Sequence, residues 1–279
     1  MDYKDITYDV IGHVARITAN RPHYRNAQST PMLIEMDHAF ERANFDLDVR
    51  VIVLAGAGDH FSAGHDLGTA EEIEYRGTEY TIQEGVRGRY NHTREQFVDK
   101  TLRWRNVQKP TIAAVQGYCI FGGWIIASAM DVIFAAEDAM FLGTNFQYFS
   151  IPWDIHHRKA KEILFESRFV DAAEALEFGL VNRVVSRDRL DAEVMEYATI
   201  VAENDPFQLR MIKLAVNGAQ DAQGFNQHIT AAHSSFLLSS QGEKDPDYGL
   251  ATPDSRRRPM VQQAMAKYEA MQKRKKGSG

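Results

Sequence analysis

The chain has 279 residues, of which 44% are hydrophobic and 25% charged, so it can bury a full core and shows no bias toward disorder. Its formal net charge of −6 argues against a nucleic-acid scaffold, because phosphate contacts need a basic surface. The single Cys119 cannot form an internal disulfide, the acidic start is unlike a signal peptide, and no apolar run approaches the roughly 20 residues of a membrane span. We therefore expect a soluble cytoplasmic protein acting on a small organic substrate, with no nucleic-acid or membrane partner.

The first half of the sequence alternates strand and helix patterns. Residues 13–19 alternate as a strand does, and the apolar run 49–56 ends in Gly-x-Gly, which is typical of a buried strand entering a turn. Between them, residues 30–43 carry apolar side chains at helical spacing. A third strand is predicted over 111–117, and residues 126–142 predict the end of a helix, a fourth strand and a turn.

The second half becomes increasingly helical. Residues 70–104 are polar and helical in pattern but contain three glycines, which predicts a mobile segment. Residues 158–185 predict a helix, a linker, a second helix capped by Gly179 and a short strand. From Asp188 onward nearly everything is helical in pattern. The chain is therefore expected to be an α/β unit followed by a helical region.

Two glycine-bearing turns each follow a predicted strand. FSAGHDLG occupies residues 61–68, and QGYCIFGGW, residues 116–124, opens into a predicted helix. Such a turn leaves backbone N–H groups free at a helix N-terminus, where the helix dipole favours negative charge. Two such turns facing each other can hold one developing oxyanion. Either turn alone is better explained as an ordinary bend, because glycine marks tight turns generally.

Residues 10–185 resemble the crotonase (enoyl-CoA hydratase/isomerase) superfamily. The matching stretches are ITANRPHYRNAQS, VIVLAGAGDHFSAGHDLG, KPTIAAVQGYCIFGGWIIASAMDVIFAAEDAMF and DAAEALEFGLVNRVV. The resemblance implies an α/β fold, a crotonase-like spiral of repeated ββα units, with C-terminal helices that pack the chain into a homotrimer or a dimer of trimers. We expect an acyl-CoA-binding core over residues 1–195, and a helical trimerisation region with a tail over residues 196–279.

The resemblance also implies the roles of individual residues. The oxyanion donors are the backbone N–H groups of His65 and Gly122, whereas the His65 side chain is more simply a solvent-facing or core-satisfied histidine. Coenzyme A enters as part of the substrate, an acyl-CoA thioester, and no separate cofactor or metal is expected. The residues expected to bind the substrate and its coenzyme A part are Arg25, Ala27, Ala63, Gly64, Asp66, Leu67 and Trp153.

The sequence departs from this family at the two positions where hydratases carry proton-transferring glutamates. Ile125 occupies the first position, and Asn145 aligns with the second. Neither side chain can transfer a proton. Syn-hydration by a glutamate pair is therefore not available to this chain.

A second departure is the stretch SIPWDIHH, which is shorter than the family's glycine-rich loop and brings Trp153 and Asp154 near the site. Dienoyl-CoA isomerases and chlorobenzoyl-CoA dehalogenases of the superfamily have an aspartate close to this position. An apolar pocket would raise the pKa of Asp154, as a general acid or base requires. Asp154 could equally cap the helix predicted to begin near His156, or lie in solvent.

We predict an acyl-CoA enzyme that stabilises an enolate in a backbone oxyanion hole. The reaction would be an isomerisation or hydration with a relocated acid/base, for which Asp154 is the best candidate. Two alternatives remain, a non-catalytic acyl-CoA-binding protein and a hydrolase or dehalogenase-like member that uses Asp154. Further polar candidates in the segment over the acyl pocket, each more simply a surface residue, are Glu84, Tyr90, His92 and Glu95. Bulky side chains that indicate an aromatic or cyclic acyl group are Trp124, Phe146, Tyr148, Phe149 and Trp153.

Overall fold

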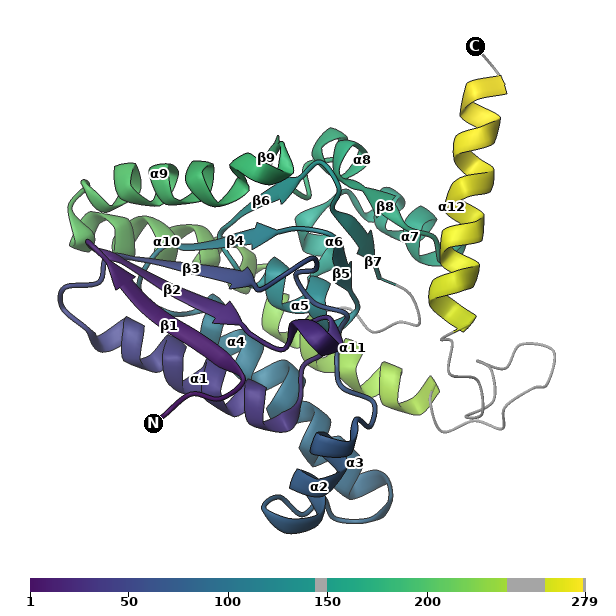
Figure 1. The fold of residues 1–279 in the computed structure, drawn as a ribbon, viewed down its shortest axis with the longest axis horizontal. Coiled ribbons are helices and arrows are strands. Elements are labelled where there is room, and N and C mark those ends of the chain that lie inside the picture. Colours follow the sequence, from purple (N-terminus) through teal and green to yellow (C-terminus); the bar gives the residue numbers. More distant parts are fainter. Residues whose placement is uncertain (144–149, 240–258, 278–279) are drawn as a thin grey trace.

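The computed structural model describes residues 1–143, 150–239 and 259–277. Its centre is a six-stranded sheet in the order β1-β2-β3-β4-β6-β9 (Figure 1). Strand β1 forms an antiparallel hairpin with β2, and the other neighbouring strands pair in parallel. The strands are β1 (Ile6–Ile11), β2 (Val14–Ala19), β3 (Val51–Gly56), β4 (Thr111–Val115), β6 (Val132–Ala136) and β9 (Arg183–Val185).

Both faces of this sheet are buried because successive side chains point to opposite sides. In β3, Val51 and Val53 belong to the hydrophobic cluster beneath α9 (Leu190–Ala202), whereas Ile52 and Leu54 belong to the larger cluster on the other face. That second face is covered by α1 (Thr30–Phe45), α4 (Lys100–Arg105) and α5 (Gly122–Ser128). The layered α/β core predicted from the sequence is confirmed.

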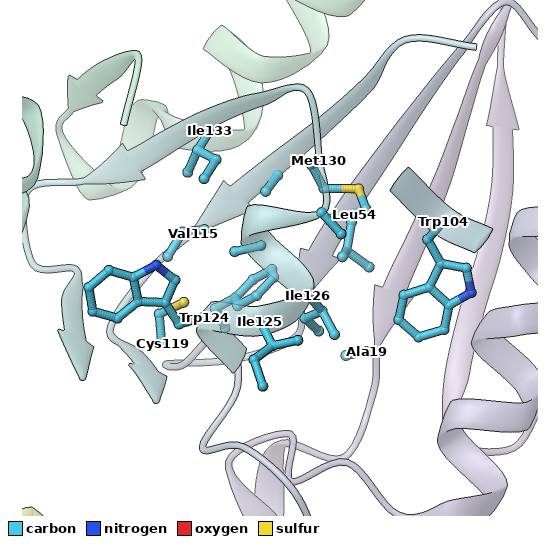
Figure 2. Close-up of a cluster of buried hydrophobic side chains, with 14 of the residues drawn as sticks. Ala19, Leu54, Trp104, Val115, Cys119, Trp124, Ile125, Ile126, Met130 and Ile133 are labelled. Atoms are coloured by element: carbon cyan, nitrogen blue, oxygen red, sulfur yellow. The ribbon is translucent and has the colours of Figure 1, made fainter. Parts of the chain in front are cut away.

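Helix α5 lies within this larger cluster and has buried residues on every side, as expected for a helix that is apolar all round. Figure 2 shows Trp124, Ile125 and Ile126 of this helix among the surrounding core side chains. Because α5 starts at the second glycine turn, its packing fixes the position of that turn.

A second, three-stranded sheet has the order β5-β7-β8 and consists of β5 (Tyr118–Ile120), β7 (Met140–Leu142) and β8 (Val170–Asp171). Helix α12 (Pro259–Gly277) packs beside it through Ala264, which shares a cluster with Ile120 and Phe121 (Figure 1). The Tyr268 hydroxyl donates a hydrogen bond of 2.8 Å to Asp171. The C-terminal helix is therefore joined to the strand that leads into the second glycine turn.

The polar segment after the first glycine turn forms α2 (Ala70–Thr78) and α3 (Gly85–Thr93), and α3 continues through a π-helical stretch (Arg94–Asp99) into α4. Stretches of π-helix often occur at functional sites.

No helix in the described ranges is long and apolar enough to cross a membrane. The predicted domain boundary after residue 195 falls within α9. The remaining helices are α6 (Ile151–Asp154), α7 (His157–Glu166), α8 (Ala172–Glu177), α10 (Pro206–Ala222) and α11 (Phe225–Ser239).

Candidate active site

The two glycine turns lie side by side in the structure. The Ser62 N–H donates to the Tyr118 carbonyl at 2.9 Å, and the Ile120 N–H donates back to the Ser62 carbonyl at 3.0 Å. A Cβ atom added to Gly64 would lie 3.2 Å from the Gly122 nitrogen. The fold therefore places these turns against each other although Gly64 and Gly122 are 58 positions apart in the sequence.

Each turn presents one backbone N–H that has no acceptor among the described residues. The backbone N–H of Gln28 donates to the Gly64 carbonyl, and the Gln28 carbonyl accepts from the Asp66 N–H. His65 lies between Gly64 and Asp66 in this parallel pairing, so its own N–H points away from Gln28. Gly122 is the first residue of α5, where an N–H has no intrahelical partner. The two N–H groups predicted to form an oxyanion hole therefore both lack an acceptor in the described part of the chain.

The residue before Gly122 adopts an unusual backbone conformation. Phe121 has φ 47° and ψ −107°, a region that side-chain-bearing residues rarely adopt and that costs of order 1–3 kcal/mol. Its N–H donates to the Leu142 carbonyl at 2.8 Å, and its ring packs with Ala264 of α12. This sharp turn, held by β7 and α12, determines where the Gly122 N–H points.

The His65 imidazole is buried beside the second turn, with 6% of the residue exposed. Its ring stacks on Phe97 of the π-helical stretch at a centroid distance of 3.5 Å, and neither ring nitrogen has a hydrogen-bond partner among the residues that the structure describes. Burial, with smaller contributions from His92 and Arg76, lowers the pKa of His65 to about 3. The ring is therefore neutral near pH 7, and it is neither solvent-facing nor core-satisfied as the simpler sequence interpretation expected.

The structure brings Arg25, Ala27 and the first turn together. Arg25 is exposed and its carbonyl accepts from the Ala63 N–H at 2.9 Å, while Ala27 is buried beside it in the chain. Leu67 is 75% exposed. These positions are compatible with the substrate-binding roles expected for them, which the structure does not test.

The Asp66 side chain faces inward. Its carboxylate accepts hydrogen bonds from the Gly68 and Thr69 N–H groups and forms a 3.0 Å ion pair with Arg21. These hydrogen bonds lower the pKa of Asp66 although burial opposes the shift. The side chain therefore stabilises the loop after the first turn, and the substrate-binding role expected for Asp66 stays a prediction.

Asp154 lies at the other end of α5. It lines a cavity of about 320 Å³ together with Ser128, Arg105 and Lys213. Burial raises the pKa of Asp154 to about 7, although the Ser150 and Ser128 hydroxyls and the Arg105 charge oppose the shift. The six residue steps of α5 from Gly122 to Ser128 span roughly 9 Å at about 1.5 Å per residue, so Asp154 is far from the free N–H groups.

The alternative that Asp154 caps the following helix is wrong. Asp154 is the last residue of α6, and its carboxylate accepts from the Ser150 hydroxyl at 2.7 Å. The N-cap of α7 is His156, whose ring accepts from the Arg158 N–H. The side chain is also not in open solvent, since it is partly buried in the cavity wall.

Trp153 is attached to the helical region rather than directed at the glycine turns. Its indole N–H donates to His228 of α11 at 3.0 Å, and its ring meets Phe225 edge to face at 5.4 Å. This contact joins α6 to α11 next to the Asp154 cavity. The predicted role of Trp153 at the acyl end remains a prediction.

The structure describes only one of the two positions at which the sequence lacks the glutamates of the hydratases. Ile125 is buried in the core cluster around α5 (Figure 2), so it supplies no proton chemistry. Asn145, Phe146, Tyr148 and Phe149 lie outside the described residues.

The structure also separates the polar candidates of the α2–α4 segment. Glu84 and Glu95 are exposed, and Glu95 pairs with Arg103 at 2.9 Å. His92 is buried, and burial lowers its pKa to about 4. Among the described residues, no group of three or more His, Cys, Asp or Glu could hold a metal ion.

Comparison with known proteins identifies the family. The family model described as enoyl-CoA hydratase/isomerase matches residues 10–247. The chain belongs to the enoyl-CoA hydratase/isomerase family. The resemblance predicted from the four sequence stretches is thereby confirmed.

Individual relatives agree with this membership. EchA13 of Mycobacterium tuberculosis, which carries an enoyl-CoA hydratase name, is 37% identical over 246 residues, covering 81% of this chain and 77% of that protein. A Mycobacterium smegmatis structure described as an enoyl-CoA hydratase shares 42% identity with a TM-score of 0.75, covering 84% of this chain and 93% of the other. An enoyl-CoA hydratase/isomerase from Xanthobacter autotrophicus Py2 shares 36% identity with a TM-score of 0.79, covering 88% and 91%. The predicted crotonase-like fold is therefore confirmed.

The sequence missed two side chains at the site. Gln28 lies with the His65 ring against Gly122, and Phe97 stacks on that ring. Gln28 follows the strand predicted over 13–19, whereas Phe97 lies in the polar segment 70–104. A polar residue between Ala27 and Ser29 in the matching stretch is the one available signal for Gln28. Nothing in the pattern of residues 70–104 distinguishes Phe97 from its neighbours.

Proposed function

We propose that the chain is an acyl-CoA enzyme whose substrate thioester carbonyl accepts hydrogen bonds from the His65 and Gly122 N–H groups. The observation that carries this proposal is the pair of free donors in two adjoining turns, one of them at the start of α5. Such donors stabilise the negative charge that develops on the thioester oxygen when an enolate forms. Membership of the enoyl-CoA hydratase/isomerase family and the names of the relatives support a coenzyme A thioester as the substrate.

Asp154 is the relocated acid/base of the proposed reaction. A pKa of about 7 lets this carboxyl both accept and donate a proton near neutrality. Because Asp154 lies at the far end of α5 from the oxyanion hole, it suits a carbon several bonds from the thioester. Conjugation in a dienoyl, aryl or cyclic acyl group carries the enolate charge to such a carbon, so isomerisation of a conjugated acyl group fits best, with hydration as the related reaction.

A substrate panel tests this function. The protein is incubated with enoyl-, dienoyl-, aryl- and cyclic-acyl-CoA esters, and products are followed by mass spectrometry. We expect an isomerised or hydrated product from a conjugated member, with no free coenzyme A released. Binding of thioesters without turnover of any member would instead indicate a non-catalytic acyl-CoA-binding protein, and release of coenzyme A would indicate a hydrolase.

A further inference from the structure

Two buried polar side chains meet beside the Gly122 N–H with hydrogen-bonding capacity unused. Gln28 is 2% exposed, and its amide group donates to the Ser62 hydroxyl at 3.3 Å. Within the described parts of the chain, neither its Oε1 nor either ring nitrogen of His65 has a hydrogen-bond partner. Leaving buried polar atoms unpaired destabilises a protein, so such atoms in a native structure call for an explanation, and a bound ligand is one.

Two of the unpartnered atoms, Gln28 Oε1 and His65 Nδ1, lie against Gly122. A Cβ atom added to Gly122 would lie 2.6 Å from Gln28 Oε1, 2.7 Å from His65 Cε1 and 2.8 Å from His65 Nδ1. Both side chains therefore border the residue that supplies one proposed oxyanion donor, and His65 itself supplies the other. The α-carbon of a thioester is bonded to the carbonyl carbon whose oxygen these donors would hold, and the imidazole is the titratable side chain carried by one of the two donor residues.

The imidazole is held in place and kept neutral. Phe97 stacks on one face of the ring, and His92 meets Phe97 edge to face at 5.8 Å and 76°. The titratable and charged groups that act on the ring are His92 of α3 and Arg76 of α2, and both disfavour its protonation. A neutral imidazole has a free lone pair that accepts a proton.

We propose that the His65 imidazole is the catalytic base at the α-carbon of the acyl group, and that Gln28 is a positioning residue that stabilises its protonated form. The proposal rests on the oxyanion hole of the proposed function and assigns the proton transfer that occurs beside it. An imidazole nitrogen takes the α-proton, the C–H electron pair forms the enolate C=C bond, and the negative charge moves to the thioester oxygen between the two N–H donors. The imidazolium exchanges its proton with solvent and returns one to the α-carbon. Where the acyl group has a double bond conjugated with the enolate, protonated Asp154 protonates the remote carbon instead, after which the imidazolium releases its proton to solvent and Asp154 takes one up from solvent.

Hydrogen exchange at the α-carbon tests the proposal without knowledge of the natural substrate. Hexanoyl-CoA, which has no double bond to isomerise or hydrate, is incubated with the protein in D₂O, and deuterium incorporation is measured by mass spectrometry. The variant His65→Phe keeps the backbone N–H and an aromatic ring against Phe97 but removes the base. We expect a loss of exchange rate of about 10²- to 10⁴-fold, the usual contribution of a general base, with the Kd for hexanoyl-CoA changed less than about threefold because both N–H donors remain.

A second variant should shift the pH dependence of the hydrogen-exchange rate. Gln28→Glu places a carboxylate beside the ring, which raises the pKa of His65 and shifts the pH profile of exchange toward higher pH. A base other than His65 would leave this profile in place, because the new carboxylate acts on the His65 ring. Glu95→Gln, which alters an exposed carboxylate of the same segment, is the matched control and should exchange at the wild-type rate.

The outcomes separate this inference from the proposed function. Undiminished exchange in folded His65→Phe protein, or an unmoved pH profile in Gln28→Glu, overturns the role of His65 and leaves the oxyanion hole standing. Wild-type protein that turns over a thioester of the panel but does not exchange hexanoyl-CoA also overturns it. Protein that neither binds nor converts any thioester overturns the proposed function as well.

Discussion

The two ends of α5 differ in the chemistry that they can perform. At its first residue, Gly122, the groups directed at the site are backbone N–H donors and neutral side chains. Beyond its last residue, Ser128, the cavity wall carries the titratable Asp154 and the cations Arg105 and Lys213. Backbone donors persist through most substitutions, whereas a proton carrier is lost with a single side chain. The chemistry proposed for the first end therefore depends on the backbone, while the chemistry proposed for the second end depends on the single side chain of Asp154.

The largest effect is expected from Asp154→Asn. The amide matches the carboxyl in shape but cannot transfer a proton, so turnover of a conjugated acyl-CoA should fall about 10²- to 10⁴-fold. Substrate binding should be retained because the oxyanion hole is intact. Steady-state kinetics with the active member of the panel measure the change, and Glu95→Gln serves as the control. Full turnover by Asp154→Asn would remove Asp154 from the mechanism and leave the first end of α5 as the sole reactive site.

A substitution at the first residue of α5 should have the next largest effect on turnover. The added methyl group of Gly122→Ala would press on Gln28 Oε1 and the His65 ring, which are side-chain rather than backbone atoms, and so distort the hole without unfolding the protein. We expect a loss of turnover of about 10²- to 10³-fold, as for removal of an oxyanion donor.

Gly123→Ala is the matched comparison. Its methyl group would lie 2.6 Å from the Ser62 carbonyl oxygen, a backbone atom that cannot move independently. This variant should lose thermal stability, whereas Gly122→Ala should lose mainly activity. Equal losses of stability in the two variants would contradict the assignment of Gly122 to the hole.

The sequence predicted the central strands because both of their faces are buried. The apolar run 49–56 and the stretch 111–117 became β3 and β4, and the helix over 30–43 became α1. Strand β1 was missed because it is an edge strand whose residues are mostly exposed. Strands β5, β7 and β8 have only two or three residues, too few for a periodic pattern, and their pairing depends on the tertiary structure.

The candidate site was predictable where it consists of backbone. Glycine turns after strands indicate free N–H groups, so His65 and Gly122 could be named from the sequence. The contact of Gln28 with His65, and the placement of Asp154 beside Ser128 rather than at a helix N-cap, depend on how distant segments pack. Side-chain environments of this kind leave no periodic signal in the sequence.

The stability of the protein should depend on pH through Asp154, at the second end of α5. Because burial raises the folded-state pKa of Asp154 from 3.8 to about 7, the ionised carboxylate destabilises the fold above that pH. The destabilisation diminishes as the pH falls through 7 toward 3.8, where the carboxyl is protonated in both states. Asp154→Asn should therefore be more stable than wild type at pH 8, by on the order of 1 kcal/mol after allowance for partial exposure, and this advantage should shrink by pH 5. Thermal unfolding across this range measures it, and an advantage independent of pH would exclude the raised pKa.

The smallest effect is expected from Tyr268→Phe. This variant tests whether the oxyanion hole depends on the hydrogen bonds of α12 or only on the packing of that helix. The variant removes the hydrogen bond from the Tyr268 hydroxyl to Asp171 but keeps the ring. Unfolding in urea should show a loss of about 0.5–1.5 kcal/mol, the usual net value of one hydrogen bond. Turnover should stay at the wild-type level because the variant keeps the ring, which packs against the cluster that contains Phe121 and Ala264. A large loss of turnover would mean that the conformation of Phe121, and with it the Gly122 donor, depends on the anchoring of α12 at Asp171.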